Sequence, residues 1–188
     1  MPPTSLPRIS VEEYHRLVQT GVLREDDPVE LVDGVIVQKM PATPFHAASI
    51  RRLSHLFESI NRDRWITAVG NPVQIGDWSE PEPDLVLLHP HENFYCERHP
   101  RPADAFLIIE VSDSTLIVDH EGKLRIYARA GIAEVWIVNL PECVVEVYSS
   151  PTNGEYALCR RVHGGDVLAP SAFPDAAIET AALLQTGA

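Results

Sequence analysis

The stretches Pro83-Asp84-Leu85-Val86-Leu87-Leu88 and Phe106-Leu107-Ile108-Ile109-Glu110-Val111 decide the fold class of this 188-residue chain. Each contains a short unbroken apolar run, the pattern of a β-strand buried on both faces. Each also carries a carboxylate at the edge of that run. Such a carboxylate is costly to desolvate unless it meets a cation, a hydrogen-bond donor or open water. Two of them, on strands expected to be neighbours, suggest a divalent metal site.

The segments before these strands are expected to form helices and a hairpin. Ser10 and Glu13 have the spacing of a capping box for a helix over 11–18, and Thr43-Pro44 is typical of the start of a longer helix. Between them, Asp33-Gly34 separates two apolar runs, which predicts an N-terminal β-hairpin over 29–37.

The rest of the chain predicts a mixed sheet. Ser114-Thr115 is expected to cap a helix that ends near Gly131, long enough to cross over between parallel strands. Asn153-Gly154 predicts a second hairpin. Further strands are expected over 65–69, 72–75, 134–138, 144–148 and 155–160, and a short helix over 176–184. The fold class is α/β, with a mixed central sheet flanked by helices.

Length and composition indicate one domain over residues 9–188, preceded by a Pro-rich stretch over 1–8 that is expected to be disordered. We find no secretory signal and no apolar run long enough to cross a bilayer, so we expect a cytoplasmic protein with no membrane partner. The three scattered cysteines indicate neither a disulfide framework nor a zinc site. The net charge of −12 counts against constitutive tight binding to duplex DNA, which usually requires a basic face.

The carboxylates suit a particular kind of metal. Mg²⁺ and Mn²⁺ prefer oxygen ligands, commonly one or two carboxylates with waters and a substrate phosphate. Asp84 and Glu110 supply that number, and the backbone carbonyl of Val111 is beside them in sequence. Glu30, on the predicted hairpin, is a candidate third oxygen donor or a supporting partner. Lys123, on the helix after Glu110, could orient an attacking water or stabilise a pentavalent transition state.

The two carboxylates also have simpler interpretations. Asp84 follows a proline and could cap the turn before its strand. Glu110 could form a structural ion pair with Lys123 or Arg125. Either arrangement would satisfy the carboxylate without a metal.

The supporting residues have alternatives too. Lys123 and Asp119, four residues apart, could be an ordinary exposed helix pair. Glu30 could pair across the hairpin with Lys39 or another base. His46, in the first turn of its helix, could contact a phosphate or have no special role.

Two other site types are disfavoured by the sequence. His89, His91 and His99 share one loop, but their spacing matches no common structural zinc site. Ser112 and Ser114 lack a plausible His-Asp set for a serine hydrolase.

Several motifs together resemble the Uma-two family of the restriction-endonuclease-like PD-(D/E)XK superfamily. The resemblance runs from the first helix to the strand near Tyr148, and the motif order matches. The motifs are Glu30-Leu31-Val32-Asp33-Gly34, Pro83-Asp84, Glu110-Val111-Ser112, Asp119-x-x-x-Lys123-x-x-x-Tyr127 and Gly131-Ile132-Ala133-Glu134-Val135-Trp136-Ile137-Val138.

The resemblance implies a three-layer restriction-endonuclease-like core and a Mg²⁺-dependent nuclease site. Asp84 and Glu110 would be the metal ligands, and Glu30 would take the acidic position from the N-terminal region. Ser112 stands where the superfamily's short motif has a lysine. The family pattern places a lysine on the following helix instead, where this chain has Lys123.

Three functions remain open at this point. The first is a Mg²⁺- or Mn²⁺-dependent endonuclease acting on DNA, with homodimerisation suited to cutting two strands. The second is a catalytically inactive dimeric binding or scaffold protein, which the acidic charge and Ser112 favour. The third is a hydrolase of small phosphorylated substrates.

Overall fold

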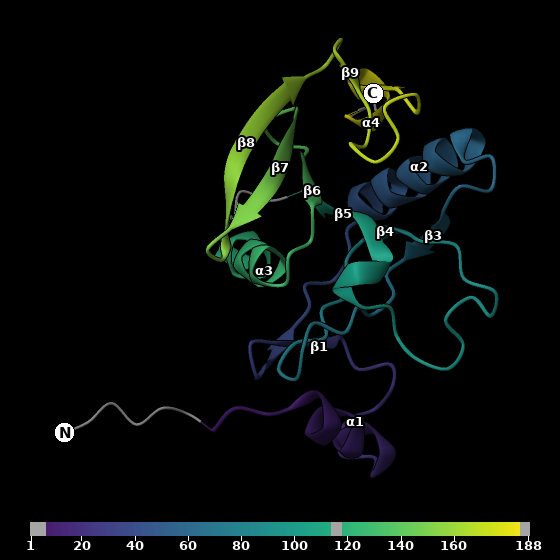
Figure 1. The fold of residues 1–188 in the computed structure, drawn as a ribbon. Coiled ribbons are helices and arrows are strands. Elements are labelled where there is room, and N and C mark those ends of the chain that lie inside the picture. Colours follow the sequence, from purple (N-terminus) through teal and green to yellow (C-terminus); the bar gives the residue numbers. More distant parts are fainter. Residues whose placement is uncertain (1–6, 114–117, 185–188) are drawn as a thin grey trace.

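The computed structural model describes residues 7–113 and 118–184, without the side chains of residues 118–121. Its centre is a six-stranded sheet in the order β3-β4-β5-β6-β7-β8 (Figure 1). The strands are β3 (Ile66–Val69), β4 (Leu85–Leu88), β5 (Ala105–Ser112), β6 (Glu134–Asn139), β7 (Val144–Thr152) and β8 (Glu155–His163). Neighbouring strands pair antiparallel except β5 and β6, which are parallel. The sheet is therefore mixed, as the sequence predicts.

Two helices cover opposite faces of this sheet. Leu53 and Phe57 of α2 (Pro44–Ile60) pack on the face formed by Leu85, Leu87, Leu107 and Ile109. Tyr127 of α3 (Val118–Arg129) packs on the other face, with Val86, Leu88 and Ile108. Figure 1 shows α2 and α3 on either side of β4 and β5. The alternation of side chains along each strand thus produces the expected three-layer core.

The crossover from β5 to β6 runs through α3, as predicted from its length. The expected cap at Ser114-Thr115 lies outside the described residues. Gly131, two residues after the helix, has a φ of +76°, the left-handed conformation that commonly follows a helix end.

The N-terminal region also forms the predicted elements. Ser10 and Glu13 make both hydrogen bonds of a capping box on α1 (Val11–Gln19). The strands β1 (Val29–Val32) and β2 (Val35–Gln38) pair antiparallel around Asp33 and Gly34, which have φ of +49° and +81°. Positive φ at both positions matches a type I′ turn, which requires residues such as Asp-Gly.

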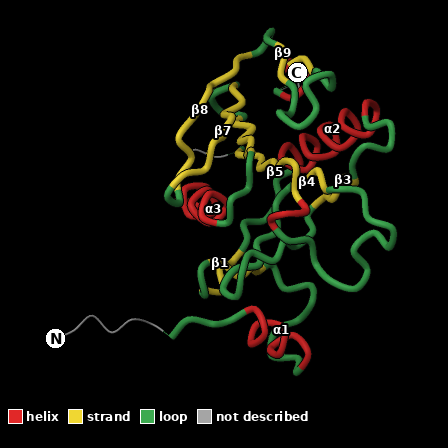
Figure 2. The backbone as a smooth tube through the Cα atoms, viewed as in Figure 1, coloured by secondary structure: helices red, strands yellow, loops and turns green. Residues whose placement is uncertain are grey.

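The hairpin is anchored to the segment that leads into β4. The Glu80 N–H donates to the Leu31 carbonyl at 2.8 Å, and the Asp33 N–H donates to Ser79 Oγ at 2.8 Å. Arg8, at the end of the stretch expected to be disordered, ion-pairs with Asp33 and lies 4.8 Å from the Trp78 ring centroid. Residues 1–6 lie outside the described residues. Figure 2 shows that loops make most of the connections between this region and the central sheet.

The prediction of a strand over 72–75 is wrong. Val73 and Ile75 are buried, but their backbone N–H groups donate to the carbonyls of Pro81 and Ser79. The Gln74 N–H donates to the Pro100 carbonyl. The alternating apolar pattern here reflects burial beneath neighbouring loops, which accept the backbone hydrogen bonds in place of a strand partner.

The pairing of β4 with β5 contains one irregularity. Leu85, Val86 and Leu87 pair with Ile109, Ile108 and Leu107, whereas Leu88 pairs with Ala105. Phe106 is therefore an extra residue on β5, as in a β-bulge. The bulge lies at the end of the strand pair next to the 89–104 connection, and the other end keeps a regular register.

The last elements that the structure describes form a small unit next to α2. Strands β9 (Val167–Leu168) and β10 (Ile178–Glu179) pair antiparallel, and α4 (Thr180–Leu183) follows. The helix expected over 176–184 is thus limited to one turn. Across the described parts of the chain, no helix combines the length and the apolar character that a membrane span needs.

Candidate functional site

The register of β4 and β5 brings Asp84 and Glu110 together. Leu85 pairs with Ile109, so Asp84, one residue before β4, lies opposite Glu110. Residues opposite each other in an antiparallel pair share one face of the sheet. The Val111 N–H also donates to Asp84 Oδ2 at 2.7 Å, which fixes the aspartate side chain against β5. The structure therefore juxtaposes the two carboxylates that the sequence singles out.

Helix α3 supplies two groups to Glu110. Lys123 and Tyr127 are four residues apart and so lie on one face of the helix. The Tyr127 hydroxyl donates to Glu110 Oε1 at 2.7 Å, and Lys123 Nζ lies 3.5 Å from the same oxygen. Lys123 is therefore not an exposed helix residue, because only 14% of its side chain is accessible.

The N-terminal hairpin brings Glu30 to the same place. Glu30 Oε1 lies 3.0 Å from Lys123 Nζ, and its Oε2 accepts a hydrogen bond from the Glu82 N–H at 2.9 Å. The base that pairs with Glu30 is therefore Lys123 of α3, whereas Lys39 of the hairpin region pairs with Glu82. We call Glu30, Asp84, Glu110 and Lys123 the acidic cluster.

Burial shapes the protonation of the acidic cluster. Desolvation raises the pKa of Glu110 from 4.5 to about 7, assisted by the charges of Asp84 and Glu30, although Lys123 and Tyr127 oppose this shift. Burial alone would lower the pKa of Lys123, but the charges of Glu110 and Glu30 raise it above its ordinary value. The lysine is therefore a permanent cation, whereas Glu110 takes up a proton near neutral pH.

His46 joins the site from the first turn of α2. Its Nε2 lies 3.1 Å from Asp84 Oδ1, and its Nδ1 lies 4.0 Å from Asp113 Oδ1. The hydrogen bond to Asp84 raises the pKa of His46 and outweighs the opposing effect of burial. The Thr43 hydroxyl, which caps α2, donates to Asp113 Oδ2 at 2.5 Å and so positions that carboxylate.

The three remaining predicted site residues are Val111, Ser112 and Asp119. Val111 is buried, and its N–H is engaged by Asp84. Ser112 is buried at the end of β5, and its carbonyl accepts a hydrogen bond from the Leu140 N–H at 2.9 Å. Asp119 belongs to α3, but its side chain lies outside the described part of the chain.

Two contacts were missed at the sequence level. Tyr127 lies on the apolar stripe of α3 and is fully buried, as a core residue would be, but its hydroxyl donates to Glu110. Asp113 carried no distinguishing pattern. Only its position directly after β5, the strand that carries Glu110, could have pointed to it.

The raised pKa of Glu110 predicts a pH-dependent stability in metal-free buffer. The folded state holds the proton more tightly than the unfolded chain, so this stabilisation is present below about pH 4.5 and is lost as pH rises through about 7. The free energy of unfolding should fall by up to ~1.4 kcal/mol per pH unit in that window. Urea denaturation of the wild type and Glu110→Gln at pH 5 and pH 8 checks this. Equal pH dependence in both proteins would contradict it.

Comparison with known proteins identifies the family. Residues 11–182 match the model of the Uma2 family, whose description is "putative restriction endonuclease". The chain is also similar to the crystal structure of a putative nuclease belonging to DUF820 from Anabaena variabilis. The TM-score is 0.70 and the identity 17%, over 94% of this chain and 97% of the other, which shows a common fold. No curated protein matches the chain. The match across most of the chain shows that it belongs to the Uma2 family.

Proposed function

We propose that the acidic cluster is the active site of a Mg²⁺-dependent endonuclease that hydrolyses phosphodiester bonds in DNA. The observation that carries this proposal is the excess of negative charge. Glu30 and Glu110 are buried and Asp84 is largely so, yet Lys123 is the only cation in the cluster. When all three carboxylates are deprotonated, as metal binding requires, they and the one ammonium leave two negative charges. A divalent cation offsets that excess, and oxygen donors are the ligands that Mg²⁺ prefers.

The residues divide into ligands and supports. Asp84, Glu110 and the Val111 carbonyl would hold the ion, because they adjoin one another at the end of the β4–β5 pair. Mg²⁺ or Mn²⁺ bound there would polarise the scissile phosphate and lower the pKa of an attacking water. Glu30 acts through Lys123, whose ammonium it holds near Glu110.

Lys123 serves as a fixed positive charge in this proposal. Its raised pKa keeps the ammonium protonated across the physiological range, so it cannot act as a general base. Its chemistry is to stabilise the negative charge that develops on the phosphate oxygens. Ser112 occupies the usual lysine position two residues after Glu110, and Lys123 reaches Glu110 from α3 instead.

His46 is proposed to bind a phosphate oxygen of the substrate. A raised pKa favours the imidazolium form, which can donate to an anion beside Asp84. We expect His46→Gln to reduce kcat/KM about tenfold, less than the roughly 10²–10⁴-fold of general acid–base catalysis, because His46 is proposed to bind the phosphate and not to transfer a proton. The loss should shrink at high pH, where the wild-type imidazole is neutral. His55→Gln, on the exposed face of the same helix, is the matched control. Equal activity of the two variants would contradict the role of His46.

A cleavage assay tests the proposed activity. Purified protein is incubated with supercoiled plasmid, linear duplex and single-stranded DNA, in Mg²⁺, in Mn²⁺ and in EDTA. Cleavage that requires the metal is expected with at least one substrate. If no DNA is cut under any condition, the proposal of an endonuclease is wrong and a binding or scaffold role is favoured.

We further propose that the protein acts as a homodimer. Cutting both strands of a duplex suits a two-fold symmetric pair of sites. Sedimentation equilibrium at micromolar concentration checks this, and a mass of one chain would contradict it.

A further inference from the structure

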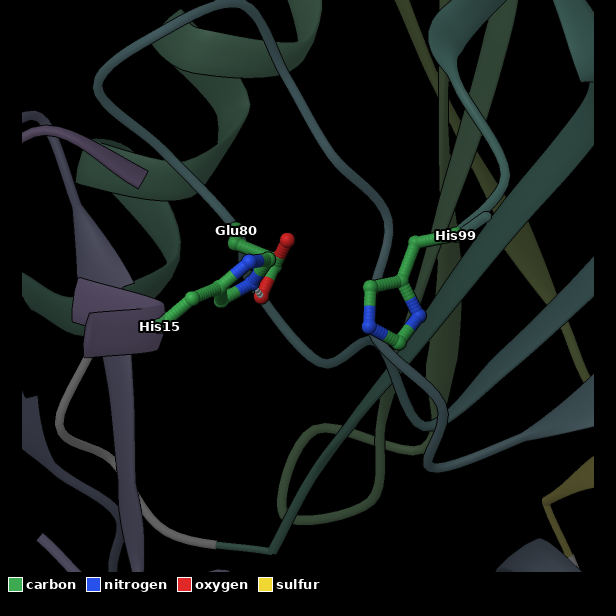
Figure 3. Close-up of side chains that lie close together, drawn as sticks. All are labelled: His15, Glu80 and His99. Atoms are coloured by element: carbon green, nitrogen blue, oxygen red, sulfur yellow. Dashed lines mark hydrogen bonds and ion pairs between the residues drawn. The ribbon is translucent and has the colours of Figure 1, made fainter. Parts of the chain in front are cut away.

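A second group of candidate ligands lies outside the acidic cluster. His15 on α1, Glu80 in the segment before β4 and His99 in the 89–104 connection each offer one ligand atom, and these atoms all lie within 4.8 Å of one another. Figure 3 shows the three side chains converging from three separate segments, with His15 and Glu80 in contact. These residues are 65 and 19 positions apart in sequence, so no local spacing reveals them.

Glu80 is the residue that makes this group unusual. It is 4% exposed, and its Oε1 lies 2.7 Å from His15 Nε2. Its Oε2 is buried and has no hydrogen-bond partner among the described residues. A buried carboxylate oxygen without a donor costs free energy comparable to a lost hydrogen bond or more. A cation placed between this carboxylate and the two imidazoles would remove that cost.

We propose that His15, Glu80 and His99 bind a zinc-type transition-metal ion. Two imidazoles and one carboxylate, completed by water, form a common three-ligand set for Zn²⁺. Imidazole nitrogens disfavour Mg²⁺, which takes oxygen ligands. Zn–N distances of about 2.0–2.1 Å place tetrahedral ligand atoms about 3.4 Å apart. The three ligand atoms must therefore move closer together than the 4.8 Å within which they now lie. The exposed side chain of His99 can rotate to bring its ring nitrogen nearer.

The ion would join three parts of the fold. It would connect α1 and the 89–104 connection to the segment that contains Glu80. That segment also holds the N-terminal hairpin, through Ser79 to Asp33 and through the Glu82 N–H to Glu30. Metal binding is therefore expected to stabilise the region that supplies Glu30, whether or not the acidic cluster catalyses hydrolysis.

Calorimetry on the full chain tests the assignment. The protein is stripped with a chelator and titrated with ZnCl₂ in excess Mg²⁺, which competes for oxygen-ligand sites. One Zn²⁺ per chain and a rise in Tm are expected. His15→Ala and His99→Ala should each bind at least tenfold more weakly and lose the Tm rise.

Two control variants separate this site from its surroundings. His91→Ala removes a histidine of the same connection outside the group, and Asp84→Asn alters the acidic cluster. Both are expected to bind Zn²⁺ like the wild type. The assignment is wrong if the wild type binds no Zn²⁺. It is also wrong if the His15 and His99 variants, shown by circular dichroism to be folded, retain full affinity. Loss of binding in Asp84→Asn alone would place the ion in the acidic cluster and overturn the proposal.

Discussion

Asp84→Asn is expected to lose metal-dependent cleavage by at least ~100-fold while remaining folded. The substitution removes one of two proposed ligand charges, and even partners outside the ligand set typically change metal affinity or activity 10–100-fold. In the wild type the Val111 N–H donates to Asp84 Oδ2 at 2.7 Å. The amide oxygen of Asn can still accept this hydrogen bond. The effect should therefore fall on chemistry and metal binding, with little change in the fold.

The measurement pairs cleavage rates with Mn²⁺ calorimetry for the wild type, Asp84→Asn and Asp84→Ala. Asp175→Asn is the matched control, because Asp175 is an exposed carboxylate that pairs with Arg64. We expect the control to cut DNA and bind Mn²⁺ like the wild type. Cleavage at the wild-type rate by pure Asp84→Ala would remove this residue from the active site.

Lys123→Met is expected to lower the free energy of unfolding by roughly 3–5 kcal/mol, the usual cost of removing one partner of a buried ion pair. The ammonium lies between Glu30 and Glu110, at 3.0 and 3.5 Å from their carboxylates. Without it both carboxylates remain buried with no cation. The pKa of Glu110 should then rise further, so acid should restore part of the lost stability.

Urea denaturation at pH 5 and pH 8 measures this effect. The destabilisation should be larger at pH 8, because Glu110, deprived of its cation, must then be buried as a charge or take up a proton well above its ordinary pKa. Arg161→Met is the control, since Arg161 is half exposed and pairs with Glu142 at the surface, where ion pairs contribute little. A loss no greater in Lys123→Met than in this control would show that the buried pair contributes nothing to stability.

Local patterns were sufficient to predict most elements of the fold. Ser10 with Glu13, Asp33-Gly34 and Thr43-Pro44 each encode a cap or a turn within four residues, and all three form. The continuous apolar run before Glu110 predicted a strand buried on both faces, which β5 is. The prediction of a strand over 72–75 failed because its backbone N–H groups donate to the carbonyls of Ser79, Pro81 and Pro100 and not to a neighbouring strand.

The site was less accessible from sequence, because it assembles from segments far apart in the chain. The approach of Asp84 to Glu110 follows from two neighbouring strands, so the sequence could anticipate it. The approach of Glu30 to Lys123 depends on how the hairpin packs, which no local pattern specifies. No local pattern points to the His15, Glu80 and His99 group for the same reason, and the sequence places His99 only with its loop neighbours His89 and His91.

The bulge at Phe106 separates the 89–104 connection from the regular part of the β4–β5 pair. It lies between the 89–104 connection and the regular register that sets Asp84 opposite Glu110. An insertion or deletion in the connection can be taken up at the bulge without sliding one carboxylate past the other. The connection can therefore differ in length or charge, and so change what the protein contacts, while the register that sets Asp84 opposite Glu110 is kept.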